Sequence, residues 1–224
     1  MGSVALLVKY FALAFSALLP VINPLGSALV LLGLVGDAPP SVFRDLARKI
    51  AIRTTLFLAV VELVGTFLLE FFGISLPVVQ VAGGLVLASM GWALLNQNEA
   101  KADPDRTAVA ETTYGSLEQK IFYPLTFPVT AGPGCIVVTL TLSAHASVKG
   151  ALNDAIAHIG IFLAVVGLSL LVYLCYAYAP KITARVRPQT AHGILRVIAF
   201  VLLCIGVQIT WNGVESLLKT VLKS

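Results

Sequence analysis

The chain has 224 residues, of which 58% are hydrophobic and only 12% are charged, and its formal net charge at pH 7 is +4. A soluble globular domain is about 45–50% apolar and about 25% charged, so this composition excludes an ordinary soluble protein and indicates an integral membrane protein. The positive charge does not point to a nucleic-acid partner, because the basic loops lack the interleaved aromatic residues of such a site.

Six apolar stretches are each long enough to cross a bilayer, since a spanning helix needs about 20 largely apolar residues. The first has no basic segment before it and runs past the length of a signal-peptide core, so we expect it to be a span. A β-barrel is not expected, because barrel strands alternate in polarity over about ten residues. The sequence therefore predicts an all-α membrane protein with spans at Leu6 to Leu34, Ile50 to Phe72, Leu76 to Leu95, Ile121 to Leu142, Ile156 to Tyr178 and Ile194 to Leu218.

The first stretch is interrupted by the sequence NPLG at residues 23–26. Asn is a strong N-cap, Pro is preferred at the first position of a helix, and Gly lets another group approach the backbone. Asn23, Pro24 and Gly26 therefore predict that the helix breaks and a new half-helix begins. Such a start leaves unpaired N–H groups and a partial positive charge, which a bilayer tolerates only inside protein or beside a cavity.

The second stretch carries Glu62 near its middle. An acidic residue at that depth is costly unless it faces a cavity or binds a proton, so Glu62 is the candidate for proton coupling. A protonated Glu62 that hydrogen-bonds a neighbouring helix would give the same sequence pattern, and this alternative stays open. His158, near the start of the fifth stretch, is expected to pack against other helices or lie at the membrane interface.

One long polar connection, residues 96–120, separates the third stretch from the fourth and carries charges of both signs. It is expected to be a linker without chemistry of its own. The chain would then consist of a first three-helix repeat at 1–95 and a second repeat at 121–224.

The fourth stretch repeats the interruption of the first, because residues 126–135 read TFPVTAGPGC. A shift of the first half by 108 positions aligns Pro20 with Pro128, Val21 with Val129 and Gly26 with Gly134. The third and sixth stretches give weaker support, because LVLASMG set against VLLCIGV aligns Gly91 with Gly206. Three spans per repeat is an odd number, so the second repeat must enter the membrane in the opposite orientation. Inverted repeats with broken helices are typical of secondary transporters.

Gly132, Pro133 and Gly134 predict the second half-helix start. Two such starts in inverted repeats can point at one space near the bilayer midplane, which would suit a small anion or the carboxylate of a zwitterion. The polar lining of this substrate site is predicted to include the hydroxyls of Ser27, Thr126 and Thr130 and the amides of Gln80, Gln208 and Asn212. The alternative is that Pro and Gly only kink two helices, with Ser and Thr satisfying the freed backbone groups.

The Lys and Arg residues predict the orientation. The loops after the first, third and fifth stretches, with the adjoining helix ends, hold Arg44, Arg48, Lys49, Arg53, Lys101, Arg106, Lys120, Lys181, Arg185, Arg187 and Arg196. The other side holds Lys9, Lys149, Lys219 and Lys223. The positive-inside rule then places the 96–120 loop in the cytoplasm and both termini outside.

Cofactors, metals and enzyme chemistry find no support in the sequence. The three cysteines are odd in number and lie within predicted spans, so no disulfide is assigned: they are Cys135, Cys175 and Cys204. The histidines lack the spacing of a metal site, and they are His145, His158 and His192. A membrane enzyme would need a nucleophile and a base at matching depth, which the spans do not offer in a recognisable pattern.

Four segments of the chain resemble the MarC family. They are NPLG in the first stretch, FRDLARKIAIRTT between the first and second, FGISLPVVQVAGGLVL leading into the third, and PVTAGPG in the fourth. The resemblance covers nearly the whole chain. It implies a six-span protein of the inner membrane whose substrate is a small neutral amino acid such as glycine or alanine.

The expected function is therefore secondary transport of small neutral amino acids, with a proton or another cation as the candidate coupling ion. The alternatives that stay open are a channel or exporter of other small solutes and a non-transporting scaffold. The expected partners are the lipid bilayer and the amino acid, and association into a homo-oligomer stays open.

Overall fold

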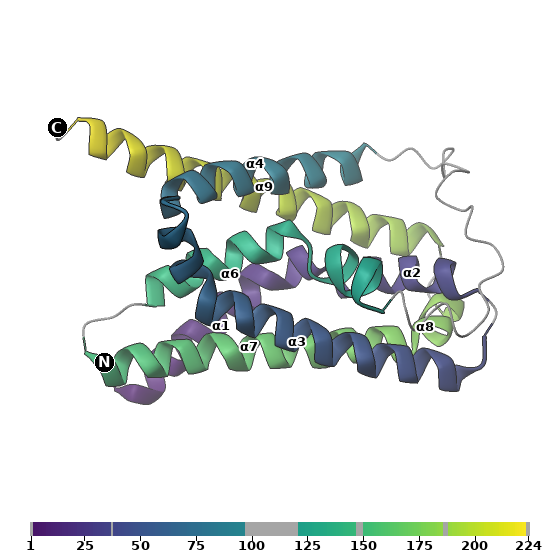
Figure 1. Cartoon of the computed structure of the whole chain (residues 1–224). Coiled ribbons are helices and arrows are strands. Elements are labelled where there is room, and N and C mark those ends of the chain that lie inside the picture. The colour runs from purple at the N-terminus through teal and green to yellow at the C-terminus, as the bar shows by residue number, and fades with distance from the viewer. Residues whose placement is uncertain (1, 37, 97–120, 147–149, 186–187, 223–224) are drawn as a thin grey trace.

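The computed structural model describes residues 2–36, 38–96, 121–146, 150–185 and 188–222, which form helices and no β-strand (Figure 1). Almost all of the predicted linker lies outside the described residues. In chain order the elements are α1 (Ser3–Ile22), α2 (Pro24–Val35), α3 (Pro40–Phe71), α4 (Leu76–Leu95), the irregular helix η2 (Ile121–Thr130), α6 (Pro133–Ala146), α7 (Ala151–Ala177), α8 (Ala179–Arg185) and α9 (Pro188–Val221).

The helices match the spans expected from the apolar stretches. Among the described residues, five helices are long and apolar enough to cross a membrane, and a sixth span results if the bent pair η2 and α6 is counted as one. Helices α1 and α2 together count as a single span, Ser3–Val35, whereas η2 and α6 meet at an angle of 65°. The prediction of an all-helical membrane protein is confirmed.

Helix α3 begins well before its apolar stretch. It starts at Pro40, directly after another proline, and Pro suits the first position of a helix. The added turns precede Ile50 and carry charged residues, among them Lys49, whose Nζ lies 2.8 Å from the carboxylate of Asp45. Hydropathy therefore identifies only the apolar part of α3, while the helix itself begins earlier, at Pro40.

The helices pack as two groups that α6 joins. Helices α4 and α9 make the most extensive contact of the described chain, and α1 and α3 both pack against α7. Helix α6 contacts α4 on one side and α1, α3 and α7 on the other. The α4–α9 contact depends on small residues: a Cβ on Gly206 would lie 2.3 Å from the backbone N of Ala88. Such close backbone approach is how membrane helices associate without a hydrophobic driving force.

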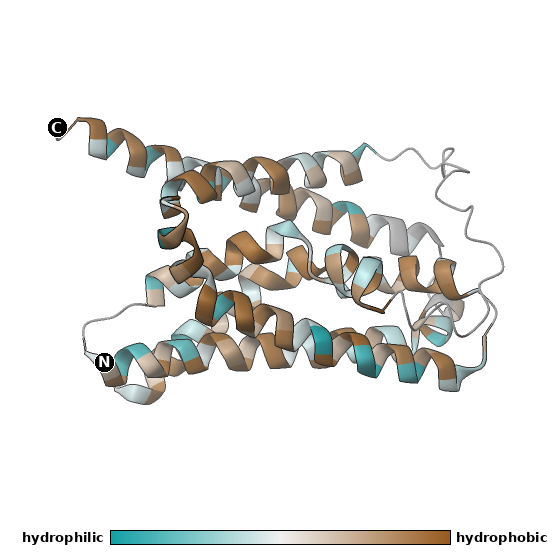
Figure 2. Cartoon of the chain, in the orientation of Figure 1, coloured by the Kyte–Doolittle hydropathy of each residue, from teal (hydrophilic) through white to brown (hydrophobic). Residues whose placement is uncertain are grey.

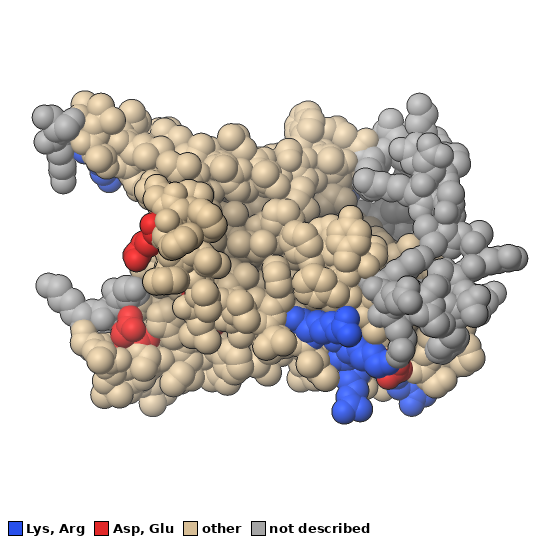
Figure 3. Space-filling view, viewed as in Figure 1, with Lys and Arg blue, Asp and Glu red and all other residues tan. Residues whose placement is uncertain are grey.

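The surface of the bundle is apolar along the spans, as Figure 2 shows. Large side chains point outward there, including Leu63, which is 71% exposed, and Phe67, which is 66% exposed. Both termini lie at one end of the bundle (Figure 1), and Lys and Arg side chains gather at the other end (Figure 3). This is the arrangement that the charge bias predicts for the two ends, although the side of the membrane that each end faces stays a prediction.

Candidate functional site

The first interruption is a single residue, Asn23. Its backbone is left-handed, with φ 45° and ψ 64°, and it ends α1 by donating its N–H to the carbonyl of Leu19 at 3.0 Å. It also begins α2, because its Oδ1 accepts from the N–H of Gly26 at 3.1 Å and Pro24 takes the first helical position. Asn tolerates the left-handed conformation better than most residues, so one side chain serves both helix ends.

Gly26 is required for this cap. A Cβ at that position would lie 2.3 Å from Nδ2 and 2.8 Å from Cγ of Asn23. The group that approaches the Gly26 backbone is therefore the amide of Asn23 itself. This contact explains the spacing of NPLG, because the capping side chain must fold back over a residue that lacks a side chain.

The second interruption is longer and has no capping side chain of this kind. Within η2, Tyr123 and Phe127 have extended backbone conformations, each followed by a proline. The hydroxyl of Thr126 donates to the carbonyl of Ile121 at 2.7 Å, and that of Thr130 donates to the carbonyl of Leu125 at 2.6 Å. Two threonines thus satisfy carbonyls that the irregular helix leaves without a regular partner.

Helix α6 then starts at Pro133, behind Gly132. The carbonyl of Gly132 accepts from the N–H of Cys135 at 2.9 Å, which begins the new helix. Gly134 is a close-packing position: a Cβ there would lie 2.2 Å from Cδ2 of Leu87 and 3.1 Å from Cγ1 of Val21. The start of α6 is therefore held against both α4 and the end of α1.

The two interruptions meet inside the bundle. The hydroxyl of Ser27, in the first turn of α2, donates to the carbonyl of Ile22 at 2.9 Å and lies 3.4 Å from the carbonyl oxygen of Val129 in η2. From this junction α2 and α6 run towards opposite ends of the molecule (Figure 1). Both helices therefore direct their N-terminal, partially positive ends towards the same region.

The junction is closed in this conformation. Ser27, Thr126 and Thr130 are at most 6% exposed, and each of their hydroxyls is hydrogen-bonded. The hydroxyl of Thr130 also lies 2.8 Å from the phenol oxygen of Tyr176 on α7. Their predicted role in binding a substrate stays a prediction, but they already serve the structural role of satisfying the broken backbone.

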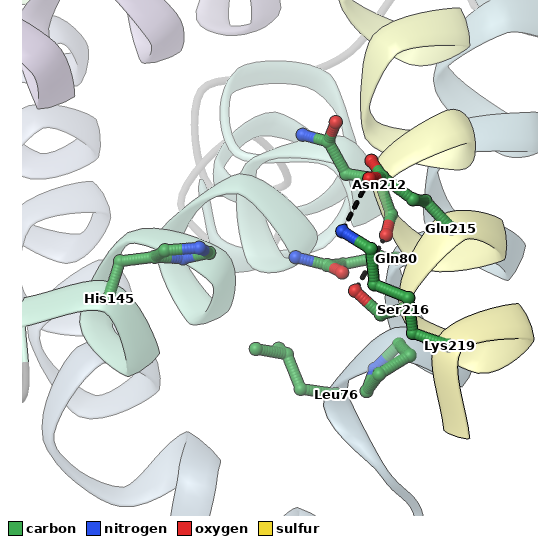
Figure 4. Close-up of a pocket in the computed structure, with 8 residues that line it drawn as sticks. Leu76, Gln80, His145, Asn212, Glu215, Ser216 and Lys219 are labelled. Carbon is green, nitrogen blue, oxygen red and sulfur yellow. Dashed lines mark hydrogen bonds and ion pairs between the residues drawn. The ribbon is translucent and has the colours of Figure 1, made fainter. Parts of the chain in front are cut away.

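The predicted amides lie elsewhere. Gln80 and Asn212 line a pocket of about 290 Å³ between α4, α6 and α9, together with Leu76, Pro77, His145, Glu215, Ser216 and Lys219 (Figure 4). Gln80 is only 3% exposed, and its amide has no hydrogen-bond partner among the described residues. Gln208 is exposed and donates to Oδ1 of Asn212 at 2.8 Å. The structure thus separates the amides from the hydroxyls.

Two interlocking contacts lie between the pocket and the junction. Val137 of α6 fills the space over Gly83 of α4, where a Cβ would lie 2.0 Å from a Val137 methyl group. One turn later on α4 and one turn earlier on α6, Leu87 fills the space over Gly134. These pairs seal α4 against α6, so the pocket opens towards the end that carries the termini.

Glu62 has a partner that the sequence did not suggest. Its side chain is 1% exposed, and Oε1 lies 3.3 Å from Nδ1 of His158 on α7. Its backbone carbonyl accepts from the hydroxyl of Ser143 on α6 at 2.8 Å. Sequence reasoning missed this contact of Glu62 with His158 and the contact of Thr130 with Tyr176. The only available signal was a polar side chain within an apolar stretch.

The rest of the chemistry is sparse. Among the residues that the structure describes, no three His, Cys, Asp or Glu side chains come close enough to hold a metal ion. Cys135 and Cys175 are buried and Cys204 is exposed, and all three are free thiols. The side chain of His192 lies outside the described part of the chain.

Comparison with known proteins agrees with this architecture. The model of a family described as MarC family integral membrane protein matches residues 8–218. The inner membrane protein MarC of Salmonella typhimurium is 30% identical over 219 residues, which cover 96% of this chain and 98% of the relative. The proteins of the same name from Citrobacter koseri and Escherichia coli are 30% and 27% identical, with the same shares covered. No solved structure matches the chain.

Proposed function

The chain belongs to the MarC family of integral membrane proteins, and from this premise we propose that it is a secondary transporter of small neutral amino acids in the inner membrane. Glycine and alanine are the substrates we expect. The inner-membrane location follows the names of the relatives and the apolar helices. The proposal includes two inverted three-helix repeats, with the substrate bound where the two interrupted spans meet.

The observation that carries the proposal is the meeting of two helix starts at one buried junction. Each start contributes roughly half an elementary positive charge and backbone N–H groups. Helices α2 and α6 run in opposite directions from it, so both positive ends favour a carboxylate placed between them. The hydroxyls of Ser27 and Thr130 lie at the same junction and retain lone pairs for an ammonium group.

The polar pocket is the proposed entrance to this site. Its volume of about 290 Å³ suffices for a small amino acid, and the unpartnered amide of Gln80 faces it. The contact of Val137 with Gly83 and that of Leu87 with Gly134 then act as the closed gate. Transport requires α4 and α9 to move relative to α6, which would open these two contacts without disturbing the tight α4–α9 pair.

The test is counterflow in liposomes. Purified protein is reconstituted with unlabelled glycine, alanine or serine inside, and uptake of the labelled amino acid is followed with and without a pH gradient. A transporter accelerates labelled uptake when substrate is present inside, and this uptake saturates. Flux that neither saturates nor depends on internal substrate would indicate a channel. Absence of flux for all three amino acids would favour other solutes or a scaffold.

Gln80→Leu provides a variant for the entrance. It removes a buried amide without adding volume, so we expect weaker apparent affinity for external substrate and an unchanged maximal rate. Gly33→Ala is the matched control, because a Cβ on Gly33 meets no atom within 4 Å. A wild-type concentration dependence in Gln80→Leu would remove the pocket from the route.

A further inference from the structure

We propose that Glu62 and His158 together form a proton-binding site between α3 and α7, and that its proton occupancy controls how α6 is held at the junction. This inference rests on the proposed function for its role in transport. The proton-binding site itself can be tested without a transport assay. It assigns His158 a role, and it links the coupling proton to one particular helix.

The first step is the environment of the carboxyl group. Glu62 lies in the apolar part of α3, one turn after Leu58, which is fully buried. Its carboxylate has His158 as its polar side-chain partner among the described residues. An isolated carboxylate is unfavourable at such a position, because a low-dielectric environment penalises the charged form.

The second step is the number of protons that the pair holds. With one proton, the pair is neutral overall, and a hydrogen bond joins Nδ1 of His158 to Oε1 of Glu62. A second proton, taken from water, makes an imidazolium beside a carboxylic acid and leaves a net positive charge. Loss of the single proton leaves a carboxylate beside a neutral imidazole, whose one ring N–H can lie on Nδ1 and donate to Oε1. Both changes place a net charge in the contact between α3 and α7, where a low-dielectric environment makes it unfavourable.

The third step is access to water. The His158 side chain is 24% exposed, whereas that of Glu62 is 1% exposed. Helix α7 begins at Ala151 at the end of the bundle that carries the termini (Figure 1), and His158 follows about two turns later. Protons therefore reach the pair through the imidazole, from the same end at which the pocket opens.

The fourth step connects the pair to α6. Ser143 of α6 donates to the carbonyl of Glu62 at 2.8 Å, and Leu140 occupies the space over Gly65, where a Cβ would lie 2.1 Å from a leucine methyl group. Helix α6 is thus anchored to α3 within one turn of the proton site. Its other end begins at the junction, so movement of this anchor alters the proposed binding site.

Unpaired hydroxyls on α6 support a second position for this helix. The buried hydroxyls of Thr139 and Thr141 have no hydrogen-bond partner among the described residues. A buried unsatisfied polar group costs about 1–3 kcal/mol and calls for an explanation. A displaced α6 that pairs these hydroxyls would offset part of the cost of moving, so the two positions of α6 would differ less in stability.

Other titratable groups near the pair are few. On α7, Asp154 precedes His158 by one turn, and on α6, His145 accepts a hydrogen bond at its backbone carbonyl from the hydroxyl of Tyr10 on α1. Arg53 and Glu70 lie more than two turns from Glu62 along α3, and Lys9 precedes Tyr10. None of these groups is hydrogen-bonded or ion-paired to Glu62 or His158 in the described chain.

Infrared spectroscopy tests the proton site directly. The pH-difference spectrum of the detergent-solubilised protein should contain a carboxyl band that Glu62→Gln removes. His158→Gln, at a partly exposed position, removes the hydrogen-bonding partner of Glu62 and should therefore move that band to a different pH. Glu70→Gln is the matched control, since it changes the same residue type at an exposed position of α3. A Glu62 band that His158→Gln leaves unchanged would overturn the shared site.

Transport and thiol labelling test the consequence. Glu62→Gln and His158→Gln should each reduce pH-driven accumulation by about tenfold or more while counterflow continues, and the double variant should be no worse than either single one. With Cys175 and Cys204 replaced by Ser, alkylation of buried Cys135 at one fixed pH should be faster in Glu62→Gln than in the parent. Retained accumulation in either single variant, or an unchanged rate of Cys135 alkylation in Glu62→Gln, would contradict the proposal. Absence of counterflow in the wild-type protein would count against the proposed function. The infrared experiment would still test the proton site in that case.

Discussion

The two interrupted spans solve the same problem by different means. Between α1 and α2, one residue in a left-handed conformation ends one helix and caps the next, and the two helices still count as one span. Between η2 and α6, ten irregular residues, two threonine hydroxyls and a bend of 65° are needed. The first interruption is therefore a local device of one side chain, whereas the second depends on the helices packed around it.

This difference teaches where each interruption is vulnerable. The first should respond to changes in the Asn23 side chain and backbone. The second should respond to volume near Gly134, because Leu87 and Val21 already occupy the space that a side chain would need. The following predictions test this division, beginning with the largest expected effect.

Gly134→Val should have the strongest effect. A side chain at this position collides with Leu87 and Val21, and overpacking of this kind costs about 1–3 kcal/mol or more. We expect counterflow to be abolished while the protein still inserts into the membrane, as shown by a monodisperse peak in gel filtration. Leu87→Ala should restore part of the activity. Full activity in Gly134→Val would show that the second interruption does not depend on close packing.

Asn23→Ala should have the next largest effect. It removes a cap worth about 0.5–2 kcal/mol and places a residue with a Cβ in the left-handed region. Asn23→Gly removes the same cap but fits the backbone, so it should retain more counterflow than Asn23→Ala. Equal losses in both variants would locate the effect in the side chain alone. Wild-type flux in Asn23→Ala would remove this interruption from the mechanism.

Thr130→Val should have a moderate effect on stability. The hydroxyl that it removes bonds the carbonyl of Leu125 and the phenol of Tyr176, and an orphaned buried partner costs about 1–3 kcal/mol. A double-mutant cycle with Tyr176→Phe, measured by thermal unfolding in detergent, isolates the Thr130–Tyr176 term. We expect the double variant to be more stable than the sum of the single losses predicts. Strict additivity would mean that the two hydroxyls are not coupled.

Ser27→Ala should have the smallest effect. Its hydroxyl donates to the carbonyl of Ile22, and a typical hydrogen bond of this kind contributes about 0.5–1.5 kcal/mol. We expect a small drop in the unfolding temperature, with weaker substrate binding if this hydroxyl also contacts the ammonium group. Ser16→Ala is the control, because its hydroxyl makes a similar bond to a backbone carbonyl at an exposed position. Identical behaviour of the two variants would leave Ser27 with a structural role only.

The parts of this molecule that depend on local sequence could be predicted. Composition and the lengths of apolar stretches predict the helices, and four consecutive residues are enough to predict a cap at Asn23. The filling of the space over Gly26 by that same amide could not be foreseen, because it depends on the left-handed backbone of Asn23. Contacts between residues far apart in the sequence could not be predicted either. The contact of Glu62 with His158 requires the rotation of α3 and α7 about their axes, which single-sequence patterns in uniformly apolar helices do not define.

The same limit explains why the predicted lining divides into two places. The depth of Gln80 and Asn212 in the membrane could be estimated from the sequence, but their distance from Ser27 depends on how α4 and α9 pack. Residues at one depth can face different neighbours. The structure groups the amides by the α4–α9 pair and the hydroxyls by the broken helices.

The glycine contacts between α4 and α9 have a consequence for how the protein is made. Gly84 and Gly206 meet with their backbones nearly touching, yet they belong to the third and the last spans of the chain. During synthesis α4 enters the membrane long before α9 emerges from the ribosome. The small-residue face of α4 therefore contacts lipid until α9 inserts. Assembly is then completed only when the C-terminal helix inserts. A nascent chain that stalls before this helix would expose an unpaired α4, which quality-control proteases of the membrane can recognise.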